Sequence, residues 1–317
     1  MTEGNIVAQS QHPLLEVLLG RNIALATHAE NLIREAHRVV DFTLSTFPSG
    51  TDHTAKHTTM VECIGKMLLS DAFLGSMTDE ELFFLVTACH FHDLAMAGTA
   101  ADDATAETRD QVRRDHAIRI GQKIANDWRT LGFENERYAH VLGEVCRGHR
   151  PEKNADGEAH WNELNAVEIL APGSTVRLRL VSALIYAIDE LHLGSDRAPA
   201  RVEDWREIRE EESRRHWRRH QAVNGPALLP TGSLVFQVKT DTPGFEENLR
   251  SQVFRKAFSA VKDLVREARE NGITVALPAL EVQWDRQRMW QLLIPIACSD
   301  LCPRTRQEIE QAVLAGC

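Results

Sequence analysis

The chain has 317 residues and a formal net charge of −10 at pH 7; 43% of its residues are hydrophobic and 26% are charged. This composition is ordinary for a globular protein that buries a sizeable core in one large domain or two small ones. The acidic balance argues against broad nucleic-acid binding, which needs an extended basic face. It is still compatible with a local basic pocket for a small phosphorylated ligand.

The cysteines and the apolar segments of the sequence indicate in which cellular compartment the protein is expected. The six cysteines are scattered and form no CxxC pair, so we expect reduced thiols and no disulfide framework. The first dozen residues lack the apolar segment of a signal peptide, and no run of 18 apolar residues predicts a membrane span. These features favour a cytoplasmic protein with no membrane partner.

Helical patterns follow a loose N-terminal tail. The apolar spacing predicts helices over residues 13–42 and 58–69, separated by the breaker sequence FPSG at residues 47–50. Between them, the sequence DHTAKH places His53 and His57 four residues apart. On a helix these two histidines would share one face.

Residues 82–98 form the most apolar stretch of the chain, and it predicts a helix buried on all sides. Thr78 can cap this helix and Glu81 can complete a capping box. His92 and Asp93 would then enter the core side by side. A buried carboxylate without a partner costs several kcal/mol, and a divalent metal would remove that cost. The alternative is that Asp93 caps a neighbouring segment and His92 is a hydrogen-bonded core histidine.

Two further helices carry histidines. A polar loop over residues 99–110 is expected to lead into an amphipathic helix over 109–128, in which His116 lies among inward-facing apolar residues. A helix over 134–147 ends in the sequence CRGH, which contains His149. Each histidine is either a site residue or a buried structural one.

Basic residues accompany these two histidines. Arg113 precedes His116 by one turn, and the neighbours of His149 are Arg147, Arg150 and Lys153. Guanidinium groups bind phosphate bidentately, so this cluster suits a phosphate chain. The alternatives are a solvated face for Arg113 and, for the others, a basic helix end that answers the helix dipole.

The next segments alternate between buried and charged patterns. Residues 172–174 are expected to open a buried helix that carries Asp189, where a lone carboxylate needs a cation. Residues 203–220 predict a largely solvated helix, whose last residues, 218–220, can reach a ligand or a neighbouring subunit.

Composition shifts after Gly225. Strand-like patterns at 234–239, 275–284 and 291–296 surround an amphipathic helix over 245–271, and a last helix is expected near Pro303. We therefore predict two domains, a helical one over 1–225 and a small α+β appendix over 226–317 for packing, oligomerisation or effector binding. The predicted fold class is mainly α.

The motifs DHTAKH, ACHFHDLAM, RDHAIRIG, CRGH and YAIDELHLGSDRAP occur in one order over about residues 50–200. In this order they resemble the HD-domain metal-dependent phosphohydrolases. The likeness extends in particular to the HD domains of bacterial conflict (anti-phage) systems and to deoxynucleoside triphosphate triphosphohydrolases. The resemblance implies an HD-type helical bundle.

The resemblance also assigns roles to residues. It implies that one divalent metal is bound by His57, His92, Asp93 and Asp189. His116 and His149 would either bind a second metal, with Asp93 as a bridge, or act as catalytic acids. His53 would then line the pocket or stay a solvated loop histidine. The substrate phosphates would be bound by Arg113, Arg147, Arg150, Lys153 and Arg197. His192 stands where the family usually has a second aspartate.

One or two ions of Mn, Mg, Fe, Co, Ni or Zn suit such ligands. The leading hypothesis is a deoxynucleoside triphosphate triphosphohydrolase acting in phage defence by nucleotide depletion. The alternatives are a phosphodiesterase for an oligonucleotide second messenger and a non-catalytic nucleotide-sensing subunit. Expected partners are a nucleotide substrate, an allosteric nucleotide, further copies of the chain as a homo-oligomer, and a defence partner encoded in the same operon.

Overall fold

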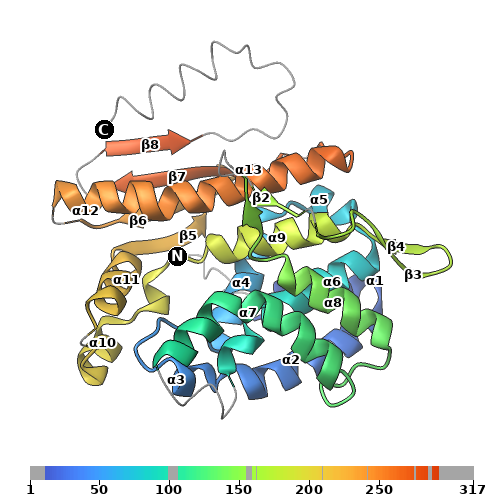
Figure 1. Cartoon of the computed structure of the whole chain (residues 1–317). Helices are drawn as coiled ribbons and strands as arrows, with labels where there is room; N and C mark the ends of the chain where they lie inside the picture. The colour runs from blue at the N-terminus through green and yellow to red at the C-terminus, as the bar shows by residue number, and fades with distance from the viewer. Residues whose placement is uncertain are drawn as a thin grey trace, which may run out of the picture.

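The structure is a computed structural model that describes residues 11–98, 106–154, 159–161, 163–208, 210–240, 242–274, 276–284 and 288–292. The predicted N-terminal tail, apart from its last residues, and the predicted helix near Pro303 lie outside the described residues. The described chain is mainly helical, as predicted, with small sheets (Figure 1).

The first two thirds of the chain form a bundle of helices. Its elements are α1 (Pro13–Arg21), α2 (Ile23–Val40), α3 (Thr43–Thr46), α4 (Ala55–Leu68), α5 (Asp71–Gly75), α6 (Asp79–Phe91), the short η1 (Leu94–Ala97), α7 (Ala106–Asp127), α8 (Glu136–Arg147) and α9 (Leu178–Glu190). Two small antiparallel hairpins precede α9, formed by β1 (Glu152–Lys153) with β2 (Ala159–His160) and by β3 (Glu168–Ala171) with β4 (Ser174–Val176).

In Figure 1 the remaining elements lie to the left of the bundle and above it. They are η3 (Ser195–Arg197), α10 (Ala200–Arg206), α11 (Glu211–Gln221), β5 (Val223–Leu228), β6 (Ser233–Val238), α12 (Pro243–Asn248), η4 (Leu249–Phe254), α13 (Arg255–Glu270), β7 (Ala279–Trp284) and β8 (Arg288–Leu292). The strands form one sheet in the order β5-β6-β7-β8. Only the β6–β7 pair is parallel, because α12, η4 and α13 form the crossover between these strands.

Helix α6 lies at the centre of the bundle. The predicted capping box is present: the Glu81 N–H donates to Thr78 Oγ1 at 3.1 Å, and the Thr78 N–H donates to the Glu81 carboxylate at 3.0 Å. Arg177 Nε also donates to Glu81 at 2.7 Å, which links the start of α6 to the start of α9. Residues 81–91 are buried without exception, so this helix is enclosed on every side.

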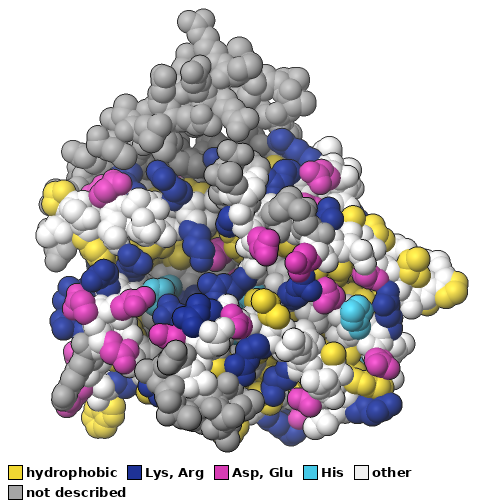
Figure 2. Space-filling model, viewed as in Figure 1, with side chains coloured by type: hydrophobic (Ala, Val, Ile, Leu, Met, Phe, Trp, Pro, Cys, Tyr) yellow, Lys and Arg dark blue, Asp and Glu magenta, His cyan; other side chains and the backbone are white. Residues whose placement is uncertain are grey.

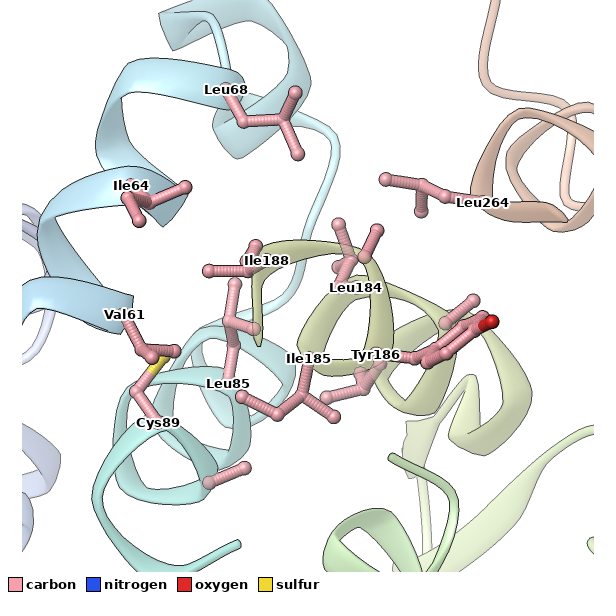
Figure 3. Close-up of a cluster of buried hydrophobic side chains, with 14 of the residues drawn as sticks. Val61, Ile64, Leu68, Leu85, Cys89, Leu184, Ile185, Tyr186, Ile188 and Leu264 are labelled. Atoms are coloured by element: carbon pink, nitrogen blue, oxygen red, sulfur yellow. The ribbon is translucent and has the colours of Figure 1, made fainter. Parts of the chain in front are cut away.

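Helices α4, α6, α9 and α13 share a hydrophobic core (Figure 3). Its labelled side chains come from α4 (Val61, Ile64, Leu68), α6 (Leu85, Cys89), α9 (Leu184, Ile185, Tyr186, Ile188) and α13 (Leu264). Because α13 lies against α9, this core runs across residue 225, and strand β5 also spans that position. The division into two domains stays a prediction.

Replacing Leu184 by alanine should destabilise the protein by about 3 kcal/mol, because the side chain is fully buried and its loss leaves a cavity. Urea unfolding followed by circular dichroism measures this difference. Leu228→Ala is the matched control, since Leu228 is 47% exposed, and it should change stability by less than about 0.5 kcal/mol. Equal effects of the two substitutions would contradict this account of the core.

Several predicted boundaries were wrong. Residues 172–174 do not open α9: residues 172 and 173 form the turn of the β3–β4 hairpin and residue 174 begins β4. Gly173 adopts φ +84°, which favours a turn over a helix start. Helix α7 starts at Ala106, inside the predicted loop. The charged segment 203–220 is divided between α10 and α11, and Trp217 within it is buried.

Candidate metal centre

Three elements bring four predicted metal ligands together. His57 lies on α4, His92 and Asp93 follow α6, and Asp189 lies on α9. The two Nε2 atoms of His57 and His92 are 3.3 Å apart. Both lie 3.4–3.5 Å from Asp93 Oδ2 and 3.5–3.6 Å from Asp189 Oδ1. Two nitrogens and two carboxylate oxygens thus converge on one point.

The hydrogen bonds of His92 fix which atoms face this point. His92 Nδ1 donates to the carbonyl oxygens of Ala88 and Cys89, at 3.3 and 3.1 Å, so Nε2 is the atom that faces this point, and it offers a lone pair when the ring is neutral. The separations of 3.3–3.6 Å among the converging atoms exceed ordinary hydrogen-bond lengths. Buried lone pairs and carboxylates at such separations suit a shared cation.

A second donor group adjoins the first. Asp93 Oδ1 lies 3.2 Å from His116 Nε2 and 3.9 Å from His149 Nε2, and these two nitrogens are 3.0 Å apart. His116 Nδ1 donates to the Arg113 carbonyl and His149 Nδ1 to the Cys146 carbonyl, so both Nε2 atoms present lone pairs to each other. A cation between them would relieve that repulsion. Asp93 contributes one oxygen to each group.

Electrostatics also favour positive charge here. Burial opposes a charge on His92, but the carboxylates of Asp93 and Asp189 outweigh burial and raise the pKa of His92 to about 10. Burial likewise opposes charge on both carboxyls, yet the neighbouring histidines lower the pKa of Asp93 and of Asp189 well below the ordinary value. Burial, with the neighbouring His116 and His92 rings, lowers the pKa of His149 to about 3.

A different cluster, formed by His12, Glu62 and His90, has the geometry of a hydrogen-bond network. Glu62 Oε2 lies 2.7 Å from His12 Nδ1 and 3.0 Å from His90 Nε2, and Glu62 Oε1 accepts from the backbone N–H groups of Leu14 and Leu15 at 2.9 Å. These are ordinary hydrogen-bond lengths that satisfy the carboxylate with four donors. We therefore interpret this cluster as structural, in contrast to the wider spacing around Asp93.

A cavity of about 890 Å³ opens onto the Asp93 groups, with His149, His116 and Asp189 in its wall. Figure 2 shows basic side chains gathered around a hollow in which a histidine is visible. The basic residues that line the cavity are Arg109, Arg113, Arg150, Arg197, Arg215, Arg219 and Lys256. Acidic residues of α11 and the segment before it share the rim. Three of the five predicted phosphate ligands, Arg113, Arg150 and Arg197, are therefore at the cavity.

The other two predicted phosphate ligands point elsewhere. Arg147 pairs with Glu163 and lies 3.7 Å from Glu144. Lys153 Nζ lies 2.7 Å from the Tyr186 hydroxyl and 3.3 Å from Asp263 Oδ2. Neither residue lines the cavity, so the structure does not bring them to the candidate site.

His53 lines the cavity, which favours the pocket alternative over a solvated loop histidine. Its Nε2 lies 2.9 Å from Arg197 Nη2 and 3.9 Å from Asp93 Oδ2. Burial, together with the charge of Arg197, lowers the pKa of His53 to about 4. His216 and Lys256 also line the cavity, although neither was among the predicted site residues. For His216, the four-residue spacing to His220 on α11 was the available signal.

The helical bundle and the buried histidine–aspartate groups define an HD-type domain whose side chains could bind a divalent metal. The chain belongs to the HD-CE family, whose model matches residues 47–270. No curated protein and no solved structure matches the chain. The predicted superfamily is thus confirmed, and the arrangement is compatible with a metal-dependent hydrolase. Among the described residues, no helix is long and apolar enough to span a membrane.

Proposed function

We propose that the protein is a metal-dependent nucleotide phosphohydrolase, and specifically a deoxynucleoside triphosphate triphosphohydrolase. The observation that carries the proposal is the position of Asp93, which gives one oxygen to each of two donor groups in the wall of an arginine-lined cavity. The HD-CE family match supports the phosphohydrolase class. A role in nucleotide depletion during phage infection rests on the sequence resemblance alone.

The chain's own residues suit this chemistry. His57, His92, Asp93 and Asp189 would hold one ion, and Asp93, His116 and His149 a second. Divalent ions in these positions supply Lewis acidity toward a phosphoryl group. His149 Nδ1 donates to the Cys146 carbonyl, so its Nε2, which faces Asp93, can offer a lone pair to a metal. This favours the second-metal alternative for His149 over the acid alternative.

The experiment that tests the proposal is a product assay. Purified protein is incubated with Mn²⁺ or Mg²⁺ and each dNTP and NTP, alone and in pairs, and the products are separated by chromatography. A nucleoside and tripolyphosphate from a dNTP are the expected products. A requirement for a second nucleotide would indicate an allosteric site. Absence of turnover for every mononucleotide would overturn the triphosphohydrolase proposal and favour an oligonucleotide phosphodiesterase or a sensor subunit.

Arg113→Ala should lower kcat/KM about 10- to 100-fold, mainly through KM, because a charge-assisted hydrogen bond to phosphate contributes about 1.5–3 kcal/mol. Arg113 lines the cavity one turn from His116. Arg147→Ala is the matched control: it removes the same group from a position outside the cavity and should change kcat/KM less than about twofold. Steady-state kinetics decides, and an equal loss in both variants would contradict the assignment of Arg113.

A further inference from the structure

His192 lies between a candidate metal ligand and a carboxylate. It follows α9, three residues after Asp189, and is 1% exposed. Its Nδ1 is 2.8 Å from His57 Nδ1, and its Nε2 is 3.0 Å from Asp196 Oδ2. His57, His192 and Asp196 therefore form a continuous chain that leads away from the metal centre.

The two imidazole rings have the relative orientation that an N–H···N hydrogen bond requires. Their planes differ by 5° and their centroids are 5.0 Å apart, while the facing nitrogens are only 2.8 Å apart. The distance between the ring centroids exceeds the distance between the nitrogens by about one ring width. This is possible only when both nitrogens lie on the line between the centroids, so the rings meet edge to edge. The proton and the lone pair both lie in the ring planes, and the bond between them is close to linear.

The chain of contacts determines the tautomers. An ionised Asp196 can only accept, so His192 Nε2 carries the proton that it donates. His192 Nδ1 is then a lone pair, and the proton between the two rings belongs to His57 Nδ1. That leaves His57 Nε2 with a lone pair directed at His92, Asp93 and Asp189.

Local packing holds the Asp196 carboxylate in its hydrogen bond with His192. Lys56 Nζ, one residue before His57 on α4, donates to the Asp196 backbone carbonyl at 3.0 Å. A side chain at Gly194 would come within 2.5 Å of Asp196 Oδ1 and 2.8 Å of the Gly225 carbonyl oxygen, so only glycine leaves room for the carboxylate. The Nδ1 atoms of His92, His116 and His149 donate to backbone carbonyls, which are neutral acceptors. The Nδ1 atom of His57 donates instead to an imidazole that is hydrogen-bonded to a carboxylate.

We propose that His192 and Asp196 are positioning residues that hold His57 in the tautomer with a free Nε2 and strengthen its binding of a divalent cation. This rests on the proposed metal site. Partners of ligand histidines fix ring orientation and raise ligand basicity, and their loss typically costs about 10- to 100-fold in metal affinity. In this protein the role falls to the residue at which the sequence departs from the usual aspartate.

The test compares His192→Leu with His192→Asn. Leucine fills a similar volume but removes the acceptor for His57, whereas the asparagine side-chain oxygen can still accept from His57 Nδ1. Titration calorimetry of the metal-free proteins with Mn²⁺ should give a Kd raised about 10- to 100-fold for His192→Leu and only a few-fold for His192→Asn. Asp196→Asn should give an intermediate loss and serves as the second variant if His192→Leu fails to fold.

Nitrogen NMR of ¹⁵N-histidine-labelled, metal-free protein adds a readout independent of activity. His57 should be protonated at Nδ1 in the wild type and lose that preference in His192→Leu. An unchanged Kd and tautomer in His192→Leu would overturn the proposal, as would equal losses for leucine and asparagine. If the wild type binds no metal, the proposed function fails, but the tautomer of His57 still tests the role of His192.

Discussion

Replacing Asp93 by alanine is expected to reduce metal-dependent hydrolysis on the order of 10³-fold or more. Asp93 is the only residue with an oxygen in both described donor groups, so its loss weakens two sites at once. Lewis-acid stabilisation of a phosphoryl group contributes several kcal/mol, and each 1.4 kcal/mol changes a rate about tenfold. The hydrolysis rate, measured by steady-state kinetics, and the metal content, measured by mass spectrometry, should fall together.

The matched control for this substitution is Asp127→Ala. Asp127 is exposed near the end of α7, where it lies 3.7 Å from Lys123, and its loss should leave activity and metal content unchanged. Circular dichroism establishes that both variants are folded. A folded Asp93→Ala protein with wild-type metal content would contradict the assignment of Asp93 as a shared ligand.

Replacing Glu62 by alanine should destabilise the protein by about 3–5 kcal/mol, the range for removing one member of a buried charged network. Glu62 is fully buried on α4 and accepts from His12, His90 and the first N–H groups of α1. Its loss leaves these donors unsatisfied in the core. Urea unfolding measures the effect. Glu30→Ala, which removes an exposed carboxylate 3.7 Å from Arg34, should cost less than about 1 kcal/mol.

The same carboxylate predicts a pH dependence. Burial opposes its charge, but the hydrogen bonds from His12 and His90 outweigh burial and lower the pKa of Glu62 from 4.5 to about 2. A lowered pKa stabilises the folded state above pH 4.5, and this contribution of about 3 kcal/mol is lost as the pH falls toward 2. Glu62→Gln should lack that share of the acid sensitivity. Parallel stability–pH curves for wild type and variant would argue against this network.

The two histidine–carboxylate clusters differ in a way that their residue types do not reveal. Around Glu62, the separations of 2.7 and 3.0 Å leave room for a proton and nothing else. Around Asp93, the distances from histidine Nε2 atoms to its carboxylate oxygens are 3.2–3.9 Å. In these histidines the other ring nitrogen, Nδ1, already donates its proton to a backbone carbonyl or to His192. Ligand spacing and tautomer, more than composition, distinguish a metal centre from a buried network.

The sequence by itself determined the helical class, the central helix and the order of the motifs that resemble an HD domain. Helix α6 was predictable because an apolar run follows the capping box of Thr78 and Glu81, and both are local signals. The proximity of His57, His92, Asp93 and Asp189 was expected because the HD resemblance named these four residues together, and because a buried carboxylate needs a partner.

Other features were decided only by the tertiary structure. The β3–β4 hairpin and strand β5 depend on pairing between segments, which has no reliable signature in short polar stretches. The directions of Arg147 and Lys153 depend on which carboxylates lie nearby, and these come from Glu163 and from Asp263, 110 residues away in the case of Lys153. The hydrogen-bonded chain from His57 through His192 to Asp196 likewise exists only because α4 packs against α9, which brings His57 and His192 within reach although they are 135 positions apart.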